Sequence, residues 1–595
     1  MPDAERGAAD AARGAGDSAR IVERPRGEAE SQLAKSLSPR MARIFGARGV
    51  ASIDELDLSL GSLLLPSALD GVVNAAQLLA DAVVDARHIK FVGDFDADGA
   101  TSSVVGVAAL RAMGCARVSY IVPNRFEFGY GLTPEIVAIA MIDRPDVLVT
   151  VDNGISSVEG VRAARAAGAT VVITDHHLPG RELPDAHAIV NPNLPGSRFG
   201  SPNLAGVGVI FYVLSQVRAQ LRERGWFERI GIAPPNMADY LDLVALGTVA
   251  DVVPLDRNNR ILIQQGLRRI RSGRARPGIA ALCEMSRRSM RDLSAEDLGF
   301  SLGPRLNAAG RLDDMSIGIR CLLADNLTEA RSLARALEEL NETRRAIQQQ
   351  MTQEAELVVA NVDLADESAL GLCVYRDGWH QGVVGIVAGR LKERFHRPAI
   401  AFADAGAVAP DELRGSARSI PGVHIRDALD AIATRYPGLI QRFGGHAMAA
   451  GLSIRRTHLT RFADAFATEI ARWVSAREIG GVVVSDGELQ ASELELSFAD
   501  EIARAGPWGQ GFPEPLFHGD FDIVHQRVVG ERHLKLSLRI DGRVVDAIAF
   551  NHEPLPHTTR AQVAYRLARN DYRDHATLQL VVSHIQPASP PTADV

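Results

Sequence analysis

From about residue 88 onward, short apolar runs alternate with longer amphipathic runs along the chain. The apolar runs predict strands at Ile89–Gly93, Val118–Val122, Val147–Val151 and Thr170–Thr174, with Ala188–Val190 as a candidate fifth. The intervening runs predict helices at Thr101–Met113, Pro134–Met141 and Ser157–Ala167. Because apolar strands that alternate with helices form parallel sheets with right-handed crossovers, the pattern predicts a doubly wound α/β domain.

The second half of the chain shows two further patterns. Between Leu327 and Val362 there is neither proline nor glycine, and large apolar residues recur every three or four positions. This predicts one helix of roughly 50 Å that connects two domains. A second αβ pattern follows it. Short alternating runs then predict an all-β barrel with strands at Val482–Val484, Phe521–Val524, Lys535–Leu538, Val544–Phe550 and Leu578–Val582.

The first forty residues differ from the rest of the chain. They are rich in Ala, Gly, Arg, Asp and Glu and lack periodic large apolar residues, which predicts a disordered tail, with ordered sequence starting near Met41. The expected organisation is a tail (1–40), a first α/β domain with an N-terminal helical extension (41–326), a connecting helix (327–365), a second αβ domain (366–476) and a barrel (477–590).

Composition excludes several classes of protein. With 595 residues, 46% hydrophobic and 23% charged, the chain cannot be a disordered chain, a collagen or a coiled-coil rod. Four scattered cysteines indicate a reducing compartment and argue against a disulfide framework or a cysteine zinc site. The longest apolar run, of about eleven residues, is shorter than the roughly 20 that a spanning helix needs, and no signal peptide is visible. We therefore expect a cytoplasmic protein without a membrane partner.

Three aspartates at alternate positions follow the first predicted strand. Asp94, Asp96 and Asp98 lie within Gly93–Thr101, and their mutual repulsion is costly unless a divalent cation offsets it. Taken alone, the segment is also typical of an acidic surface turn. An EF-hand loop is excluded, because a strand precedes the segment and the twelfth position is not glutamate.

Further aspartates and histidines follow later elements. Asp152 ends the third predicted strand, Asp175, His176 and His177 end the fourth, and Asp251 follows an apolar helix. Any one of these could be a helix cap, but together they meet at the carboxyl edge of a parallel sheet, where such folds bind ligands. Carboxylates with one imidazole suit Mn²⁺ or Mg²⁺. Shared carboxylates suit two cations that act on both sides of an in-line phosphoryl displacement.

These residues resemble the ordered motifs of the DHH phosphoesterase superfamily: Asp94–Gly99, Asp152–Gly154, Asp175–His177 and Asp251. Gly444–His446 within Phe443–Gly451 is similar to the glycine-rich signature of the associated DHHA1 domain. The RecJ branch, bacterial single-stranded-DNA-specific exonucleases, is indicated by Ser301–Arg311, by Pro123–Arg125 with Gly129–Gly131, and by Gly378–Gly385. The resemblance runs from about residue 41 to the C-terminus and implies that the barrel is an OB-like domain.

The resemblance implies a role for each residue of the acidic cluster. Two divalent cations, Mn²⁺ or Mg²⁺, would be ligated by Asp96, Asp98, Asp152, His176 and Asp251, with Asp152 bridging them. Asp94 would orient or join this shell, and Asp175 would fix the tautomer of an imidazole. His177 would lie near the scissile phosphate, and a metal-activated water would be the nucleophile.

Several residues outside the cluster are candidates for binding DNA. Around the first domain they are Arg125, Arg305, Asn307 and Arg311; in the second, Arg414, Ser416, Arg418, Gly444, Gly445 and His446. The resemblance assigns the 5′-terminal phosphate to Ser416 and Arg418. In the barrel region Trp508 and Phe512 are candidates for base stacking and Lys535 for a phosphate contact, although such aromatic residues are equally typical of a core. Phe512 stands where the family usually has asparagine, and Phe95 where it usually has tyrosine.

The resemblance implies a 5′→3′ exonuclease that releases 5′-mononucleotides from single-stranded DNA during DNA repair and recombination. The expected protein is a monomer, whose partners are single-stranded-DNA-binding protein and recombination or helicase proteins. Two alternatives are a DHH phosphodiesterase for short oligoribonucleotides or cyclic dinucleotides, and a non-catalytic Cdc45-like replication scaffold. The net charge of -8 argues against nucleic acid, but two bound cations would offset about +4 of it.

Overall fold

The computed structural model describes residues 19–124, 131–360, 362, 370–406, 409–475, 480–530, 532–555, 558–570 and 575–588. The chain divides into two compact units, and each is described by itself. One unit holds residues 26–342 and 504–514, and the other holds 1–25, 343–503 and 515–595. We refer to them as the sheet-and-helix unit and the barrel unit. Each combines segments that lie far apart in the sequence.

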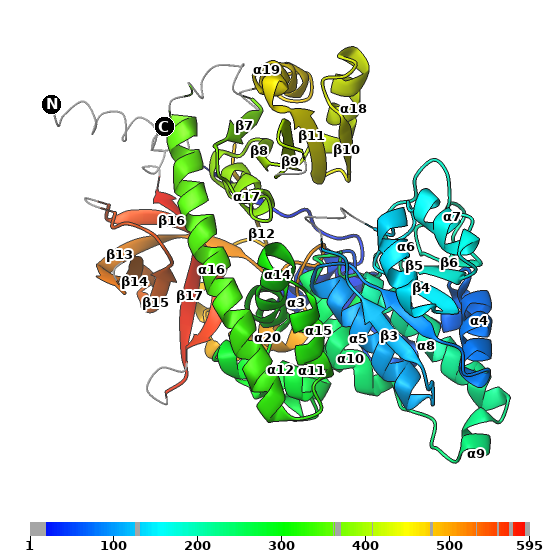
Figure 1. Ribbon diagram of the computed structural model, residues 1–595. Helices are drawn as coiled ribbons and strands as arrows, with labels where there is room; N and C mark the ends of the chain where they lie inside the picture. The colour runs from blue at the N-terminus through cyan, green and yellow to red at the C-terminus, as the bar shows by residue number, and fades with distance from the viewer. Residues whose placement is uncertain are drawn as a thin grey trace. The chain divides into compact units, whose positions relative to one another are not determined.

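The sheet-and-helix unit contains a five-stranded parallel sheet (Figure 1). Its strands are β2 (Ile89–Val92), β3 (Val118–Ile121), β4 (Val147–Val151), β5 (Thr170–Thr174) and β6 (Ala188–Val190). Their order is β3-β2-β4-β5-β6, and every neighbouring pair is parallel. The predicted doubly wound α/β fold is therefore confirmed. The order reverses between β2 and β4, which places the switch point, where such sheets bind ligands, at their carboxyl ends.

Helices cover both faces of this sheet, which explains why β2 and β4 are buried along their whole length. One face carries α4 (Val72–Val84), α5 (Ala97–Ala112) and α8 (Gly206–Glu223), and the other carries α6 (Pro134–Ala140) and α7 (Val158–Ala166). Val92 and Leu148 pack with Ile136 and Val161 on the second face. On the first face the Phe91 ring packs so closely against α5 that only a glycine, Gly106, fits there.

A helical layer follows the sheet in the sequence. Its elements are α9 (Trp226–Ile230), α10 (Leu241–Ala250), α11 (Arg257–Arg271), α12 (Pro277–Met285), α13 (Ala295–Asp297), a π-helical turn (Leu298–Leu302), α14 (Gly303–Leu312) and α15 (Ser316–Leu323). The first of the long helices, α10, is almost entirely buried and packs on α5, α8 and α11. A long helix, α16 (Leu327–Ala360), runs from this unit into the barrel unit, as its uninterrupted pattern predicts.

The barrel unit contains a mixed sheet and a closed barrel. The sheet has the order β10-β11-β9-β8-β7, in which only β7 and β8 are parallel. Its strands are β7 (Leu372–Tyr375), β8 (Ala399–Asp404), β9 (Glu412–Arg418), β10 (Arg442–Gly445) and β11 (Ala449–Arg455). Three helices pack on it: α17 (Val384–Phe395), α18 (Ile425–Arg435) and α19 (Leu459–Ile470).

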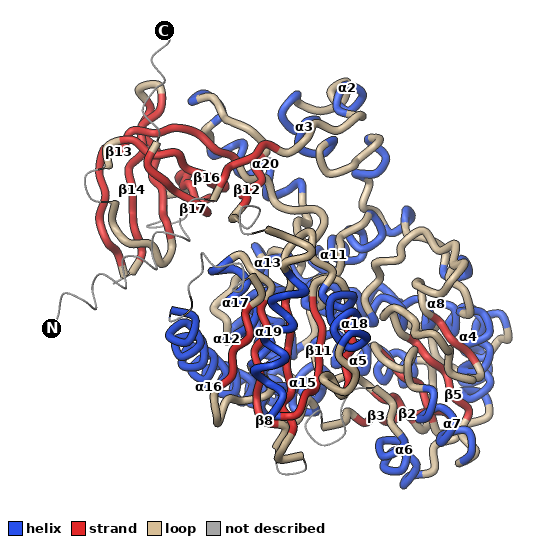
Figure 2. Tube along the Cα trace, turned by 90° about the horizontal axis from the view of Figure 1, so that it is seen from above, coloured by secondary structure: helices blue, strands red, loops and turns tan. Residues whose placement is uncertain are grey.

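The barrel closes in the order β13-β14-β15-β17-β16, with β15 and β17 parallel. Figure 2 draws its strands in red, with β13, β14, β16 and β17 labelled. Its strands are β13 (Phe517–Val529), β14 (His533–Ile540), β15 (Arg543–Ala549), β16 (Arg560–Asn570) and β17 (Thr577–Pro587), and α20 (Leu496–Ala505) precedes them. The predicted barrel is confirmed, but the sequence pattern missed β16. The predicted strand at Val482–Val484 exists as β12 (Val482–Ser485) and lies outside the barrel, paired in parallel with β1 (Arg20–Glu23).

The predicted disordered tail of residues 1–40 is too long. Strand β1 and the helices α2 (Glu30–Leu33) and α3 (Pro39–Gly46) form before Met41 or across it. These elements are ordered because β1 finds its partner strand in β12 and because Leu33 and Phe45 are buried in the sheet-and-helix unit. Residues 1–18 lie outside the described residues.

Among the described residues, no single helix is long and apolar enough to cross a membrane, although one pair bent by 84°, Leu60–Ala68 with Val72–Val84, passes on length and composition.

Candidate functional site

The three alternating aspartates lie in the turn between β2 and α5. The Asp96 side chain caps α5 by accepting a hydrogen bond from the Gly99 backbone N–H at 3.0 Å, and Asp94 Oδ1 accepts from the Phe95 N–H at 2.8 Å. A Cβ on Gly99 would lie 2.5 Å from the carbonyl oxygen of Asp94, so only glycine allows the helix to start this close to the strand end. Asp98 follows in the first turn of α5.

The amino end of α8 holds Asp98. Its two carboxylate oxygens accept hydrogen bonds from the backbone N–H groups of Gly206 (2.6 Å) and Val207 (2.9 Å). Burial, followed by the charge of Asp96, raises the pKa of Asp98 from its usual range to about 7, although these two N–H groups act in the opposite direction. A Cβ on Gly206 would lie 2.7 Å from the Cβ of Asp152. Glycine at this position therefore lets Asp98 and Asp152 meet at one helix end.

Asp152 directly follows β4 and is 1% exposed. Its φ of 63° lies in the left-handed region, which a non-glycine residue adopts at a cost that the surrounding structure must offset. The neighbouring Asn153 donates hydrogen bonds from Nδ2 to the carbonyl oxygens of Val92 (3.1 Å) and Val151 (2.9 Å). These bonds tie the ends of β2 and β4 together and hold the turn that carries Asp152.

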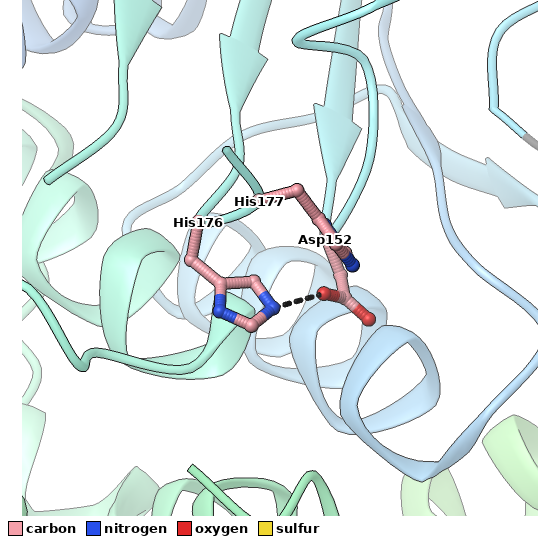
Figure 3. Close-up of side chains that lie close together, drawn as sticks. All are labelled: Asp152, His176 and His177. Atoms are coloured by element: carbon pink, nitrogen blue, oxygen red, sulfur yellow. Dashed lines mark ion pairs between the residues drawn. The ribbon is translucent and has the colours of Figure 1, made fainter. Parts of the chain in front are cut away.

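His176 and His177 follow β5 and play different parts. Figure 3 shows the His176 imidazole pointing toward Asp152. Its Nε2 lies 3.1 Å from Asp152 Oδ1, 3.5 Å from Asp251 Oδ2 and 3.9 Å from Asp98 Oδ2. His177 instead donates from Nδ1 to Asp175 Oδ1 at 2.7 Å, which fixes the orientation of its ring.

Asp175 is an organiser of the loop that follows β5. It is 1% exposed and accepts backbone hydrogen bonds from His176 (2.7 Å) and His177 (3.1 Å) at Oδ1 and from Ile155 (2.9 Å) at Oδ2. Burial lowers the pKa of His177, but the hydrogen bond and charge of Asp175 outweigh it and raise that pKa to about 9. The imidazole is therefore cationic at neutral pH when no cation neutralises the cluster.

Asp251 caps the carboxyl end of α10. The next residue, Val252, has a φ of 62° and is 64% exposed, an unusual combination for a β-branched residue. This strained turn ends the helix sharply and leaves Asp251 beside His176. Burial, followed by the charge of Asp98, raises the pKa of Asp251 well above its usual range, and the same two causes raise that of Asp152.

The cluster has the donor set of a site for hard divalent cations. Within it, ligand atoms of three groups lie within 4.8 Å of one another: Asp94, Asp96 and Asp152; Asp98, His176 and Asp251; and Asp152, His176 and His177. The aspartates raise one another's pKa values, so bringing them together costs free energy that a divalent cation would recover. Oxygen-rich donors with one imidazole fit Mg²⁺ or Mn²⁺.

Helix α14 packs on the turn that carries the three aspartates. Two residues predicted to bind DNA, Arg305 and Asn307, lie on this helix. Asn307 Oδ1 accepts the hydrogen bond of the Ala97 N–H at 2.7 Å, so its side chain holds the aspartate turn. Arg305 is 6% exposed, donates to the Ser301 carbonyl oxygen and forms an ion pair with Glu338 on α16. Its guanidinium is therefore held by partners inside this unit. Arg311 is half-buried in the last turn of α14, and Arg125 lies outside the described residues.

Of the two aromatic residues predicted to stack on bases, Phe512 is buried in the sheet-and-helix unit and Trp508 is half-buried beside it. The Phe512 ring is 3% exposed, stacks on Trp508 at 5.2 Å and lies 4.2 Å from the Arg260 guanidinium. Trp508 also stacks on Phe45 of α3 at 6.0 Å. The aromatic pair therefore fastens residues 504–514 to this unit, because its partners come from segments far away in the sequence.

This fastened segment also touches the loop that carries Asp251. The Leu255 N–H donates to the Gln510 carbonyl oxygen at 2.7 Å, and a Cβ on Gly509 would lie 2.7 Å from the Leu255 side chain. On the other side of the loop, Asn259 Nδ2 donates to the Pro254 carbonyl oxygen at 3.0 Å. We call residues 508–512 the buttress. No motif in the sequence indicated it, since the contact joins positions more than 250 residues apart.

Three predicted DNA-binding residues, including the two assigned to the 5′-phosphate, lie together on the mixed sheet of the barrel unit. Arg414, Ser416 and Arg418 alternate along β9 and so share one face, opposite the buried Leu413 and Ala417. Arg418 Nη1 donates to Ser416 Oγ (3.0 Å) and to the Ala417 carbonyl oxygen (2.8 Å), and Arg414 donates to Gln381 (3.2 Å).

The amino end of α17 faces the same residues. A Cβ on Gly385 would lie 2.9 Å from both Ser416 Oγ and Arg418 Nη2, so a larger residue here would displace these side chains. Within the described residues, no carboxylate pairs with Arg418, whose partners are neutral oxygens. A guanidinium, a hydroxyl and a helix amino end are the kinds of donor that bind an anion, so these residues are a candidate anion site.

The glycine-rich residues lie two strands away from β9 in the same sheet. Gly444 and Gly445 end β10, where Gly444 pairs with Gly451 of β11, and Gly451 in turn pairs with Ser416. His446 is exposed beside them, with its N–H bonded to the Ala449 carbonyl oxygen at 2.8 Å. The third predicted barrel residue, Lys535, lies on β14 with its Nζ 3.0 Å from Asp546 Oδ2. A surface pair of this kind is weak and leaves the ammonium accessible.

Three family matches cover most of the chain. Residues 88–248 match the N-terminal domain of the DHH family, residues 366–475 match the DHHA1 domain, and residues 485–584 match the RecJ OB domain.

Curated relatives match over nearly the full length. The single-stranded-DNA-specific exonuclease RecJ of Dickeya dadantii is 52% identical over 95% of this chain and 99% of its own. That of Escherichia coli K12 is 50% identical over 94% and 97%. Among solved structures, RecJ of Thermus thermophilus in complex with Mn²⁺ matches with a TM-score of 0.79 and 28% identity, covering 96% of this chain and 80% of that one. Its complex with Mg²⁺ matches with a TM-score of 0.74.

Proposed function

The chain belongs to the RecJ family of single-stranded-DNA-specific exonucleases, and from this premise we propose that it hydrolyses single-stranded DNA from the 5′ end and releases 5′-mononucleotides. The observation that carries the proposal is the cluster in which ligand atoms of aspartates and histidines from three strand ends and one helix end lie within a few ångströms of one another. Such a cluster suits two cations that act on one phosphodiester.

The proposed ligands are Asp96, Asp98, Asp152, His176 and Asp251, with Asp152 shared because its oxygens approach both Asp94–Asp96 and His176. Asp94 would complete the shell or orient it. When bound, the cations would supply Lewis acidity and a water of lowered pKa. The chain's own contribution is a rigid frame: two backbone N–H groups on Asp98, a turn tied by Asn153, and a helix end beside Asp251.

His177 would contact the scissile phosphate. Asp175 accepts the hydrogen bond of His177 Nδ1 and fixes the imidazole, so that a protonated Nε2 can donate to a phosphate oxygen. The raised pKa of His177 supports this charged form. Bound cations would reduce the effect of Asp94 and Asp96 on the pKa of His177. The effect of Asp175 would remain.

We propose that the 5′-terminal phosphate binds to Ser416 and Arg418 with the amino end of α17, and that Arg414 and the Gly444–His446 backbone contact the phosphates that follow. The support is the anion site on β9, where a cation without a carboxylate partner among the described residues lies beside a hydroxyl. Recognition of a terminal phosphate would make the enzyme act from an end. Arg311, Arg125 and Lys535 remain proposed DNA contacts.

We further infer a role in DNA repair and recombination, with single-stranded-DNA-binding protein and recombination or helicase proteins as partners of a monomeric enzyme. A reducing, cytoplasmic location is supported by the four cysteines, all of which are free. Burial raises the pKa of the thiols of Cys115, Cys283, Cys321 and Cys373, which keeps them unreactive.

The test is digestion of a 5′-phosphorylated single-stranded oligonucleotide with Mn²⁺ or Mg²⁺, compared with the blunt duplex of the same sequence. We expect 5′-mononucleotides from the single strand and little product from the duplex. Equal digestion of both, or progressive loss from the 3′ end, would contradict the proposal. A series of substrate lengths separates it from an enzyme for short oligoribonucleotides, because that enzyme would be fastest on the shortest members.

A further inference from the structure

A cavity of about 240 Å³ lies at the carboxyl end of the edge strand β3, inside the sheet-and-helix unit. Its wall includes Phe95 from the aspartate turn, Ile121 from β3, Ile139 from α6 and Met315 beside α15. Asn124 and Asp313 provide polar groups, and both residues are exposed at the surface. In the part of the chain that the structure describes, none of the predicted DNA-binding residues lines this cavity.

The cavity and the candidate metal centre share one rigid turn. Phe95 stands between Asp94 and Asp96, so a wall of the cavity is one residue from groups proposed to hold or orient the cations. A Cβ on Gly310 would lie 1.7 Å from the Phe95 carbonyl oxygen, which means that the α14 backbone packs directly on this turn. Asn307 bonds the same turn two residues later, at Ala97.

The chemistry of the wall indicates an uncharged, planar ligand. An aromatic residue and aliphatic side chains line the interior, as in most sites for small organic ligands, and a flat aromatic ring offers a stacking surface for a planar group. The carboxylates of Asp313 and Asp314 also line the cavity and would repel a phosphate. The volume is below the roughly 300–1,000 Å³ of pockets for drug-sized molecules, which fits a single heterocycle rather than a whole dinucleotide.

Resting on the proposed function, we propose that this cavity holds one nucleobase of the DNA strand, next to the scissile phosphate, with the Phe95 ring as its stacking surface. The base would fix the strand so that the phosphodiester reaches the metal centre in one register. Stacking on an aromatic ring tolerates every base, as an exonuclease requires. Phe95 and Ile139 then act in substrate positioning and not in the chemistry.

The test combines a substrate change with an enzyme change. A series of 5′-phosphorylated strands is prepared, each with one abasic nucleotide at one of the first six positions. The rate of each of the first cleavage steps is then measured for every strand. We expect the abasic nucleotide to slow cleavage about tenfold when it occupies one particular position relative to the cleaved bond. This factor is in line with the stacking free energy of one base. Ile139→Trp should fill the cavity, slow the intact strand to a similar extent, and make the enzyme insensitive to the abasic position.

Two variants serve as controls. Ile139→Ala leaves the cavity open and should keep the abasic effect, and Ile142→Trp adds the same bulk to a residue that is 74% exposed and does not line the cavity. A second readout needs no cleavage: 2-aminopurine at the sensitive position, bound without divalent cations, should be quenched by the wild type and not by Ile139→Trp.

Normal digestion with no sensitive position, or an abasic effect that persists in a folded Ile139→Trp enzyme, would overturn the cavity assignment and leave the nuclease intact. Absence of digestion of the intact strand by the wild type would instead contradict the proposed function.

Discussion

Single residues at the candidate metal centre bear an electrostatic cost that a divalent cation would offset. Asp98 and Asp152 are 1% exposed and stand close to other carboxylates, and their pKa values are raised accordingly. If these carboxylates served only the stability of the fold, an uncharged residue at one of the positions would be more favourable. Their retention in a tied frame indicates function at the expense of stability.

Asp152→Asn is the sharpest test at this scale. The substitution keeps the shape but removes the charge that two cations would share, so we expect cleavage to fall by about 10³-fold or more. The metal-free Tm should stay the same or rise, since a repelled, buried carboxylate is lost. Asp85→Asn, at an exposed position outside the cluster, is the control. Cleavage within tenfold of wild type would refute the assignment of Asp152.

The raised pKa of Asp98 predicts how pH affects metal binding. In the metal-free fold this carboxyl binds a proton below about pH 7, whereas the unfolded chain binds it only near the ordinary value of 3.8. The metal-free fold therefore loses stability as pH rises toward 7, and a cation must displace the proton below that pH. We expect the Mn²⁺ dissociation constant to increase up to tenfold for each pH unit below 7, and the Tm gained with Mn²⁺ to shrink in parallel. A pH-independent dissociation constant between pH 5.5 and 7.5, measured by calorimetry, would be inconsistent with a protonated Asp98.

At the scale of elements, the buttress, a segment that follows α20, packs on the loop after the proposed ligand Asp251. Residues 508–512 hold the loop after Asp251 through the Leu255 N–H, and Phe512 is held in turn by Trp508 and Arg260. These contacts fix the position of the proposed ligand Asp251, which lies at the end of α10 directly before the strained turn at Val252.

Phe512→Ala should therefore weaken metal binding as well as folding. We expect the Mn²⁺ dissociation constant to rise about tenfold or more, as for other residues that orient metal ligands, with the KM for DNA little changed. Phe550→Ala is the matched control, because it deletes the same ring from a residue that is 55% exposed. An unchanged Mn²⁺ affinity in a folded Phe512→Ala enzyme would restrict the buttress to a role in stability.

The elements that could be predicted are those whose partners lie nearby in the sequence. Strands β4, β5 and β6 follow from continuous apolar runs, and each has the predicted bounds. Strand β16 was missed because arginines interrupt its alternation, and β1 because it exists only through β12, more than 450 residues later.

The same limit applies to the site. Ligand aspartates at strand ends follow from topology, since parallel strands deliver them to one edge. The burial of Phe512 and the ion pair of Arg305 depend on Arg260 and Glu338, and no local pattern indicates those contacts. Residue type alone therefore suggested DNA binding where the fold uses the side chain for packing.

At the scale of the whole molecule, the two proposed sites lie in separate units of the chain. The metal cluster belongs to the sheet-and-helix unit, and the proposed anion site belongs to the barrel unit. The net charge of -8 is a poor predictor of DNA binding for this chain. Aspartates gather at the metal cluster, whereas the arginines proposed to bind DNA lie at other positions.

Arg418→Ala tests this division. Loss of the guanidinium should remove the preference for a 5′-phosphate over a 5′-hydroxyl end and raise the KM by roughly tenfold or more, because a charge-assisted contact to phosphate is lost. The Mn²⁺ affinity should not change. Arg426→Ala, a substitution on α18, is the control. A retained preference for the 5′-phosphate would show that Arg418 does not bind it.

Anomalous diffraction from a crystal of this protein soaked in Mn²⁺ would show directly whether one cluster holds two cations. We expect two anomalous peaks a few ångströms apart, both within coordination distance of Asp152, with Asp96, Asp98, His176 and Asp251 as the other ligands. A single peak, or peaks away from Asp152, would contradict this expectation.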